Sequence, residues 1–173
     1  LLSAVLLSTL VLAQGIIPSG GRSLSMANAS LCNTDVWAYH NNPAASGAID
    51  YFSVGISYEN RFCLKELQCQ SVAIVFPLNA GTISMGAHSY GFKMYRSVKI
   101  GLGYSLRLTD KFYAGVQLNY QNIRLKSNYG RRNAMTSEAG LYYEISDKWK
   151  FGAAVFNIGR SRLLFYQIHY LNS

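Results

Sequence analysis

The sequence predicts an all-β fold, specifically an antiparallel β-barrel that crosses a membrane, and three observations lead to this prediction. From residue 51 onward, apolar residues alternate with other residues at a period of two, which is the pattern of strands with two different faces. The connections between these segments alternate between tight turns and longer polar links. Only 14% of the residues are charged, whereas an ordinary soluble domain has roughly 25%.

The N-terminus begins with a run of thirteen mostly apolar residues that ends at Ala13. This pattern predicts the apolar core and cleavage site of a secretory signal peptide over residues 1–13, with a buried helix as the alternative. The run is too short to cross a bilayer as a helix. It has no initiating Met and no basic start, so we expect the signal peptide to be incomplete in this sequence.

Seven antiparallel strands are expected between residues 51 and 158. Four segments alternate clearly, and their apolar faces carry no charge: 51–59, 97–108, 112–121 and 136–145. In three further segments small or apolar residues on both sides blur the alternation: 67–78, 81–90 and 149–158. A tail over residues 159–173 follows, within which 163–171 is a candidate eighth strand.

The connections predict the two ends of the barrel. Tight turns are expected at 77–81, 109–111 and 146–148, and longer links at 59–66, 91–96 and 124–133. Short turns at one end and longer loops at the other are typical of outer-membrane barrels. The last link is basic, with Arg124, Lys126, Arg131 and Arg132; it is either a solvated loop tip or a contact with anionic sugars of the outer leaflet.

The composition of the polar faces predicts which face looks outward. A water-covered surface is normally rich in Lys and Glu, but these faces carry mostly Gly, Ser, Gln, Asn and Tyr. We therefore expect the apolar faces to meet lipid and the polar faces to line a lumen, with an exported soluble barrel for a small ligand as the alternative. The expected lumen-facing side chains are Lys99, Arg107, Gln117, Asn119, Glu138 and Glu144.

The sequence indicates neither an enzyme nor a cofactor or metal site. His40, His88 and His169 are far apart in the sequence and have no metal-ligand spacing with one another or with the cysteines. Glu138 and Glu144 share a strand face, but a separation of roughly 20 Å along the strand is too large for a catalytic carboxylate pair.

Charge and cysteine content limit the partners further. The net charge is +8, but the basic residues are scattered singly among aromatic residues, which argues against a nucleic-acid partner. Cys32, Cys63 and Cys69 are an odd number of thiols, so in an oxidising compartment at least one remains unpaired. Cys63 and Cys69 either pair across a loop or remain as separate small core residues.

Residues 20–46, GGRSLSMANASLCNTDVWAYHNNPAAS, resemble the N-terminal region of the FadL-like outer-membrane barrels, particularly the PorV/PorQ-type proteins of the Bacteroidetes. The matching features are Gly21-Arg22, Ala27-Asn28-Ala29, Asp35 and Asn42-Pro43-Ala44, followed by YENRF at 58–62 and KEL at 65–67. Ala27 stands where this family commonly has glycine, and the tail after Arg160 does not match the family's continuation.

The resemblance implies a plug over residues 14–50 inside a barrel of about fourteen strands, of which seven would be the N-terminal half. Plug or gating roles would fall on Asp35, Trp37, Asn42, Pro43 and Ala44. The implied functions are passage of hydrophobic compounds or participation in type IX protein secretion. The implied partners are membrane lipid and lipopolysaccharide, with hydrophobic ligands or secretion-system proteins. A small structural or adhesive barrel without a conduit is the alternative.

Overall fold

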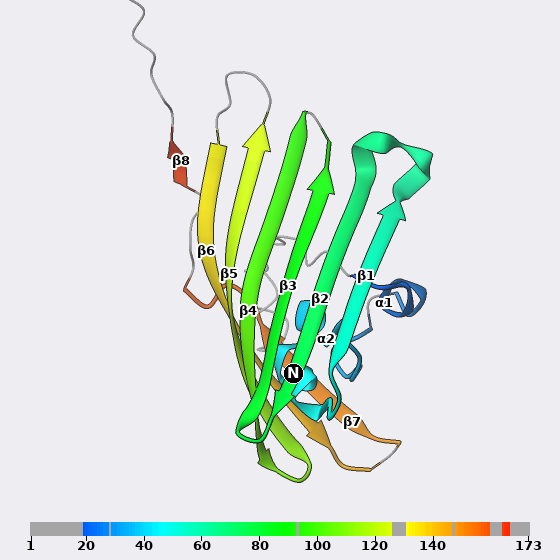
Figure 1. The fold of residues 1–173 in the computed structure, drawn as a ribbon, viewed down its shortest axis with the longest axis vertical. Coiled ribbons are helices and arrows are strands. Elements are labelled where there is room, and N and C mark those ends of the chain that lie inside the picture. Colours follow the sequence, from blue (N-terminus) through cyan, green and yellow to red (C-terminus); the bar gives the residue numbers. More distant parts are fainter. Residues whose placement is uncertain are drawn as a thin grey trace, which may run out of the picture.

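The computed structural model describes residues 19–27, 29–92, 94–125, 131–146 and 148–159, and the backbone of residues 164–166. It is all-β, and seven antiparallel strands follow one another in chain order across one curled sheet (Figure 1). The strands are β1 (Ser53–Asn60), β2 (Gln68–Leu78), β3 (Gly81–Gly91), β4 (Tyr95–Thr109), β5 (Phe112–Leu125), β6 (Arg131–Glu144) and β7 (Lys150–Val155). A short strand, β8 (Leu164–Tyr166), pairs with the part of β6 that β7 leaves uncovered.

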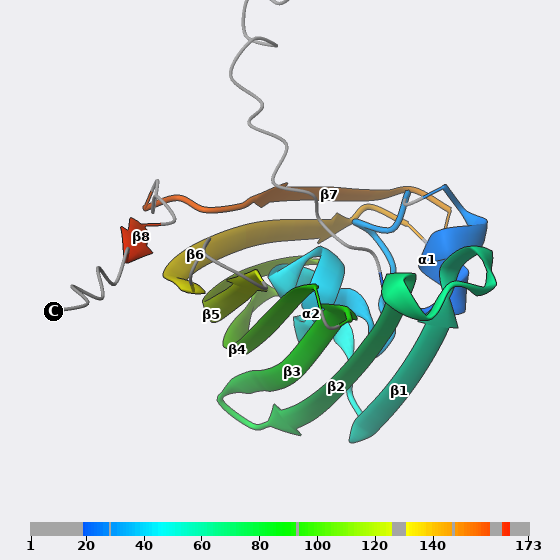
Figure 2. The ribbon, with the colours of Figure 1, turned by 90° about the horizontal axis from the view of Figure 1, so that it is seen from above.

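The sheet curls into a half-barrel, and short helices lie within its curve (Figure 2). These are α2 (Ala38–Asn41) and the 3-10 helix η2 (Pro43–Ala48), whereas α1 (Gly21–Ser25) lies at the open side of the curve, beside β1 (Figure 2). Two further 3-10 turns, η3 (Arg61–Cys63) and η4 (Lys65–Leu67), connect β1 to β2. None of the described helices has the length and apolar character needed to span a membrane.

The two faces of the sheet have opposite characters. On the convex face the apolar side chains predicted to share one side are largely exposed, from Ile56 on β1 (82% exposed) to Leu118 on β5 (61%). On the concave face polar side chains are buried, including Gln117 (1% exposed) and Asn119 (1%) on β5. A sheet in water normally does the reverse, because burying apolar area and hydrating polar groups is favourable.

The predicted alternation is therefore confirmed, but several predicted boundaries are wrong. The region 124–133 is not wholly a loop: β5 continues to Leu125, and β6 already begins at Arg131. Backbone pairing between Arg124 and Arg131 extends this hairpin, and such pairing needs no apolar alternation. The final strand is shorter than predicted, covering Lys150–Val155 instead of 149–158.

The tight turns and the longer links lie at the ends of the strands predicted for them, but their lengths differ less than predicted. Two-residue turns at 79–80 and 110–111 join strands at one end, and the segment 92–94 at the other end is almost as short. Cys63 and Cys69 are both free thiols in the structure; Cys69 is buried, whereas Cys63 is exposed and is therefore not a core residue. The predicted signal peptide and most of the segment 163–171 lie outside the described residues.

Candidate functional site

The candidate site is the contact between residues 19–50, hereafter the N-terminal segment, and the concave face of the sheet. Figure 2 shows α2 and η2 inside the curve of the strands, and η2 packs against β4, β5 and β6. The N-terminal segment also reaches both outer strands, because Val36 and Trp37 lie against Gly55 of β1 and Leu31 lies against Gly152 of β7. One short segment thus contacts the sheet from its first strand to its seventh.

The side chain of Asn42 links the N-terminal segment to the sheet. Its side chain is fully buried, and its Nδ2 donates to the carbonyl oxygens of Leu31 (2.9 Å) and of Leu141 on β6 (3.1 Å). Its Oδ1 accepts the backbone N–H of Ala44 (3.1 Å), which caps η2. Through its N–H groups and its oxygen, the Asn42 amide therefore joins Leu31 and the start of η2 to strand β6 of the sheet.

Pro43 and Ala44, the two other predicted residues of this motif, are also buried. Pro43 opens η2, where its missing N–H leaves no helical hydrogen bond unmade. Its carbonyl oxygen accepts hydrogen bonds from the hydroxyls of Ser46 (2.6 Å) and of Ser105 on β4 (2.5 Å). The turn is thus held to the sheet through backbone and small hydroxyl groups.

Inward-facing glycines make this close approach possible. A Cβ at Gly115 of β5 would lie 2.6 Å from the backbone nitrogen of Ala44, and one at Gly101 of β4 would lie 2.6 Å from the hydroxyl of Tyr39. Real Cβ atoms essentially never approach that closely. Gly140 on β6 leaves space in the same way for the side chain of Asn42. Gly101 therefore serves as a small residue on the concave face, where a side chain would collide with Tyr39.

Asp35 and Trp37 lie at the edge of the contact instead of its centre. The Asp35 carboxylate accepts the backbone N–H of Trp37 (2.9 Å) and lies 4.0 Å from the Arg22 guanidinium. The Trp37 ring packs over Gly20 and beside Gly55 of β1. Asp35 thus shapes the turn before α2, and Trp37 fixes the segment to the first strand.

Four of the predicted lumen-facing side chains gather in the buried part of the concave face. Lys99 of β4 and Glu138 of β6 form an ion pair at 2.6 Å, with only 5% of the Glu138 side chain exposed. Gln117 donates from its amide to Asn119 Oδ1 at 2.8 Å. Tyr39 enters this group from α2 and donates its hydroxyl to the Gly86 carbonyl (3.2 Å), and burial together with the nearby Glu138 charge raises its pKa.

The other two predicted lumen-facing residues lie near the end with the tight turns. Arg107 is half exposed and pairs with Asp110 of the turn at 3.3 Å. Glu144 pairs with Lys150 of β7 at 2.8 Å. These two pairs face the concave side near its rim and do not meet the Lys99–Glu138 pair.

A buried histidine cluster was missed at the level of sequence. The His40 and His88 rings, distant in the chain, lie 6.1 Å apart between centroids. His88 Nδ1 is 2.8 Å from Ser71 Oγ, and the Cys69 sulfur is 3.5 Å from His88 Nε2. Burial lowers the pKa of His40 to about 3, aided by His88 and Lys99. Within the described residues no three His, Cys, Asp or Glu side chains are placed to hold a metal ion.

Fold and site together define a half-barrel with an apolar convex face and a polar concave face occupied by an N-terminal segment. Comparisons with models of protein families, with curated proteins and with solved structures find no match to this chain.

Proposed function

We propose that this chain forms part of the wall of an outer-membrane β-barrel of the FadL-like, PorV/PorQ type, with the N-terminal segment as its plug. Movement of the plug would open a path for hydrophobic compounds or for a role in type IX protein secretion. Export through a signal peptide, the outer-membrane location and a barrel of about fourteen strands belong to the same proposal.

The observation that carries the proposal is the reversed distribution of apolar and polar side chains. Apolar residues cover the convex face, and mid-strand neighbours in register include Met85, Leu102 and Leu118, which are 44–61% exposed. Such a surface is unfavourable in water and favourable in lipid. Aromatic side chains near the tight turns, with Phe52 against Phe76 and Phe112 against Tyr143, suit a membrane interface.

The hydrogen bonds of Asn42 also support a different function, in which the lumen stays closed. A fully buried amide with three partners is costly to detach, because each unpaired buried group costs about 1–3 kcal/mol. If the segment never moves, the protein would be a structural or adhesive barrel that binds partners through its loops.

Membrane location is tested with the full-length gene product expressed in a Gram-negative host. We expect it in the outer-membrane fraction, released only by detergent, with a gel mobility that shifts on heating. Recovery in the periplasmic fraction with no heat-dependent shift would contradict the barrel and favour an exported soluble protein.

The plug is tested with Asn42→Ala. This change removes three hydrogen bonds of the segment but none within the strand ladder, so we expect normal heat-dependent mobility and faster uptake of an apolar fluorescent dye by cells. The matched control is Asn79→Ala, in the exposed turn between β2 and β3. Unchanged uptake in an assembled Asn42→Ala barrel, with the segment demonstrably released, would favour the structural alternative.

A further inference from the structure

At the loop end of the convex face, three arginines lie side by side on neighbouring strands. Arg96 of β4 is the direct cross-strand partner of Arg124 on β5, and Arg124 is the partner of Arg131 on β6. All three are exposed, and each shares the outward side of its strand with apolar residues such as Ile100 and Leu118.

This arrangement is unfavourable for the sheet alone. Directly opposed residues in antiparallel strands have Cβ atoms about 4.5–5.5 Å apart, and like charges at such positions are destabilising. In the described part of the chain, no carboxylate forms an ion pair with any of the three guanidinium groups. An anion bound at the row would therefore relieve the repulsion between these charges.

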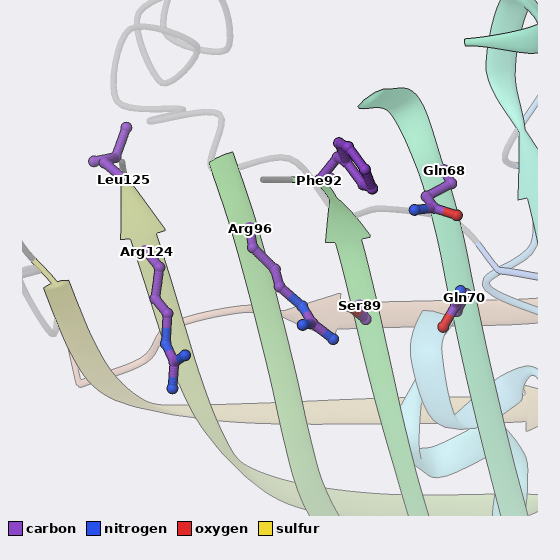
Figure 3. A pocket seen from close by; sticks show the side chains of 8 residues that line it. Gln68, Gln70, Ser89, Phe92, Arg96, Arg124 and Leu125 are labelled. Carbon is purple, nitrogen blue, oxygen red and sulfur yellow. The ribbon is translucent and has the colours of Figure 1, made fainter. Parts of the chain in front are cut away.

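The surface around the row has the shape and polarity for an amphipathic anion. A hollow of about 320 Å³ is lined by the three arginines and Asn122 and, on its other side, by Val98, Ile100 and Tyr120. A second hollow of about 440 Å³ adjoins it, and Figure 3 shows Arg96 and Arg124 at one side of it with Gln68 and Gln70 at the other. Basic and amide groups thus adjoin an apolar band.

We propose that this row, Arg96, Arg124 and Arg131, binds the phosphate groups of an anionic lipid in the outer leaflet, with an acyl chain against Ile100 and Tyr120. The inference rests on the proposed membrane location and deepens it. Guanidinium groups suit the task because they hold phosphate through paired, charge-assisted hydrogen bonds. A lipid fits better than a free anion because the hollow is apolar on the side away from the arginines.

The experiment compares thermal unfolding of the full-length protein in detergent with and without added lipid A, which carries phosphates on a glycolipid. We expect lipid A to raise the Tm of the wild-type protein. In the double variant Arg96→Gln/Arg124→Gln, binding should weaken by about tenfold or more, because each lost charge-assisted bond contributes strongly. The control Lys111→Gln/Lys148→Gln removes the same charge from the opposite end of the strands and should respond like wild type.

Further arms separate the possible outcomes. Dephosphorylated lipid A should have little effect on Tm. The variant Arg124→Lys should keep only part of the rise in Tm that lipid A causes in the wild-type protein. Equal responses in both double variants would overturn the site. An equal response to inorganic phosphate alone would overturn a lipid as the ligand. Loss of the outer-membrane location in the fractionation experiment would instead refute the proposed function.

Discussion

A single buried histidine shows how the N-terminal segment depends on neutral, well-packed groups. His40 is 6% exposed, its ring meets Trp37, Tyr39 and His88, and charge on Lys99 and His88 opposes its protonation. Its pKa falls from the ordinary value of 6.5 to about 3, because burial penalises the charged ring. The docked segment therefore carries His40 uncharged.

The consequence is a pH-dependent docking of the segment. Between about pH 6.5 and about pH 3 the undocked state binds more protons than the docked state, so docking is fully stable above this window and weakens as pH falls through it. The fluorescence of Trp37 reports this change in a Trp149→Phe background, since the chain has 2 tryptophans.

His40→Asn in that background should flatten the pH response. If the Trp37 fluorescence of the variant changed at the same pH midpoint as in the Trp149→Phe background alone, another group, such as the neighbouring His88, would be responsible for the change.

At the scale of elements, the fit between η2 and the strands rests on the absence of side chains at a few inward positions. Gly115 and Gly140 lie where Ala44 and Asn42 approach β5 and β6 most closely. The obstructing atoms at Gly115 belong to the backbone of Pro43 and Ala44, which cannot rotate away as a side chain can. A larger residue there must lift η2 from the sheet.

Gly115→Val tests this. We expect the sheet to form and the peptide 38–50 to exchange its amide hydrogens about tenfold faster or more, as overpacking costs about 1–3 kcal/mol. Hydrogen–deuterium exchange with mass spectrometry measures it. Ala114→Val, on the outward side of the same strand, is the control and should leave this peptide protected. Identical exchange in the two variants would refute the glycine contact.

The same elements show how far the sequence alone leads. Alternation assigned Gln117 and Asn119 to the polar face, because a strand's period of two assigns every residue to a side, and both are buried on the concave face. It missed the strand ends at Arg124 and Arg131, where backbone pairing continues without apolar alternation. It also missed the meeting of His40 and His88, since that contact arises only when the N-terminal segment folds back onto β3.

For the whole molecule, the outward apolar face is meaningful only in relation to its solvent. In water, Ile100 and the exposed leucines of β4 and β5 would form a large patch of the kind that drives association. In a bilayer the same patch would contact lipid chains, which is favourable, while the buried ion pair and amides of the concave face would have no contact with lipid. The two environments therefore predict opposite responses to a charge on the convex face.

Leu118→Lys distinguishes them, because Leu118 lies near the middle of β5 and is 61% exposed. At a bilayer midplane the new charge should cost about 2–4 kcal/mol, so the heat-shifting, membrane-inserted fraction should fall clearly. Ser146→Lys adds the same charge at the exposed turn between β6 and β7 and should insert normally. In a soluble protein, an exposed substitution such as Leu118→Lys would change stability by no more than about 0.5 kcal/mol and would improve solubility. That result, with both variants equally folded, would argue that water and not lipid covers the convex face.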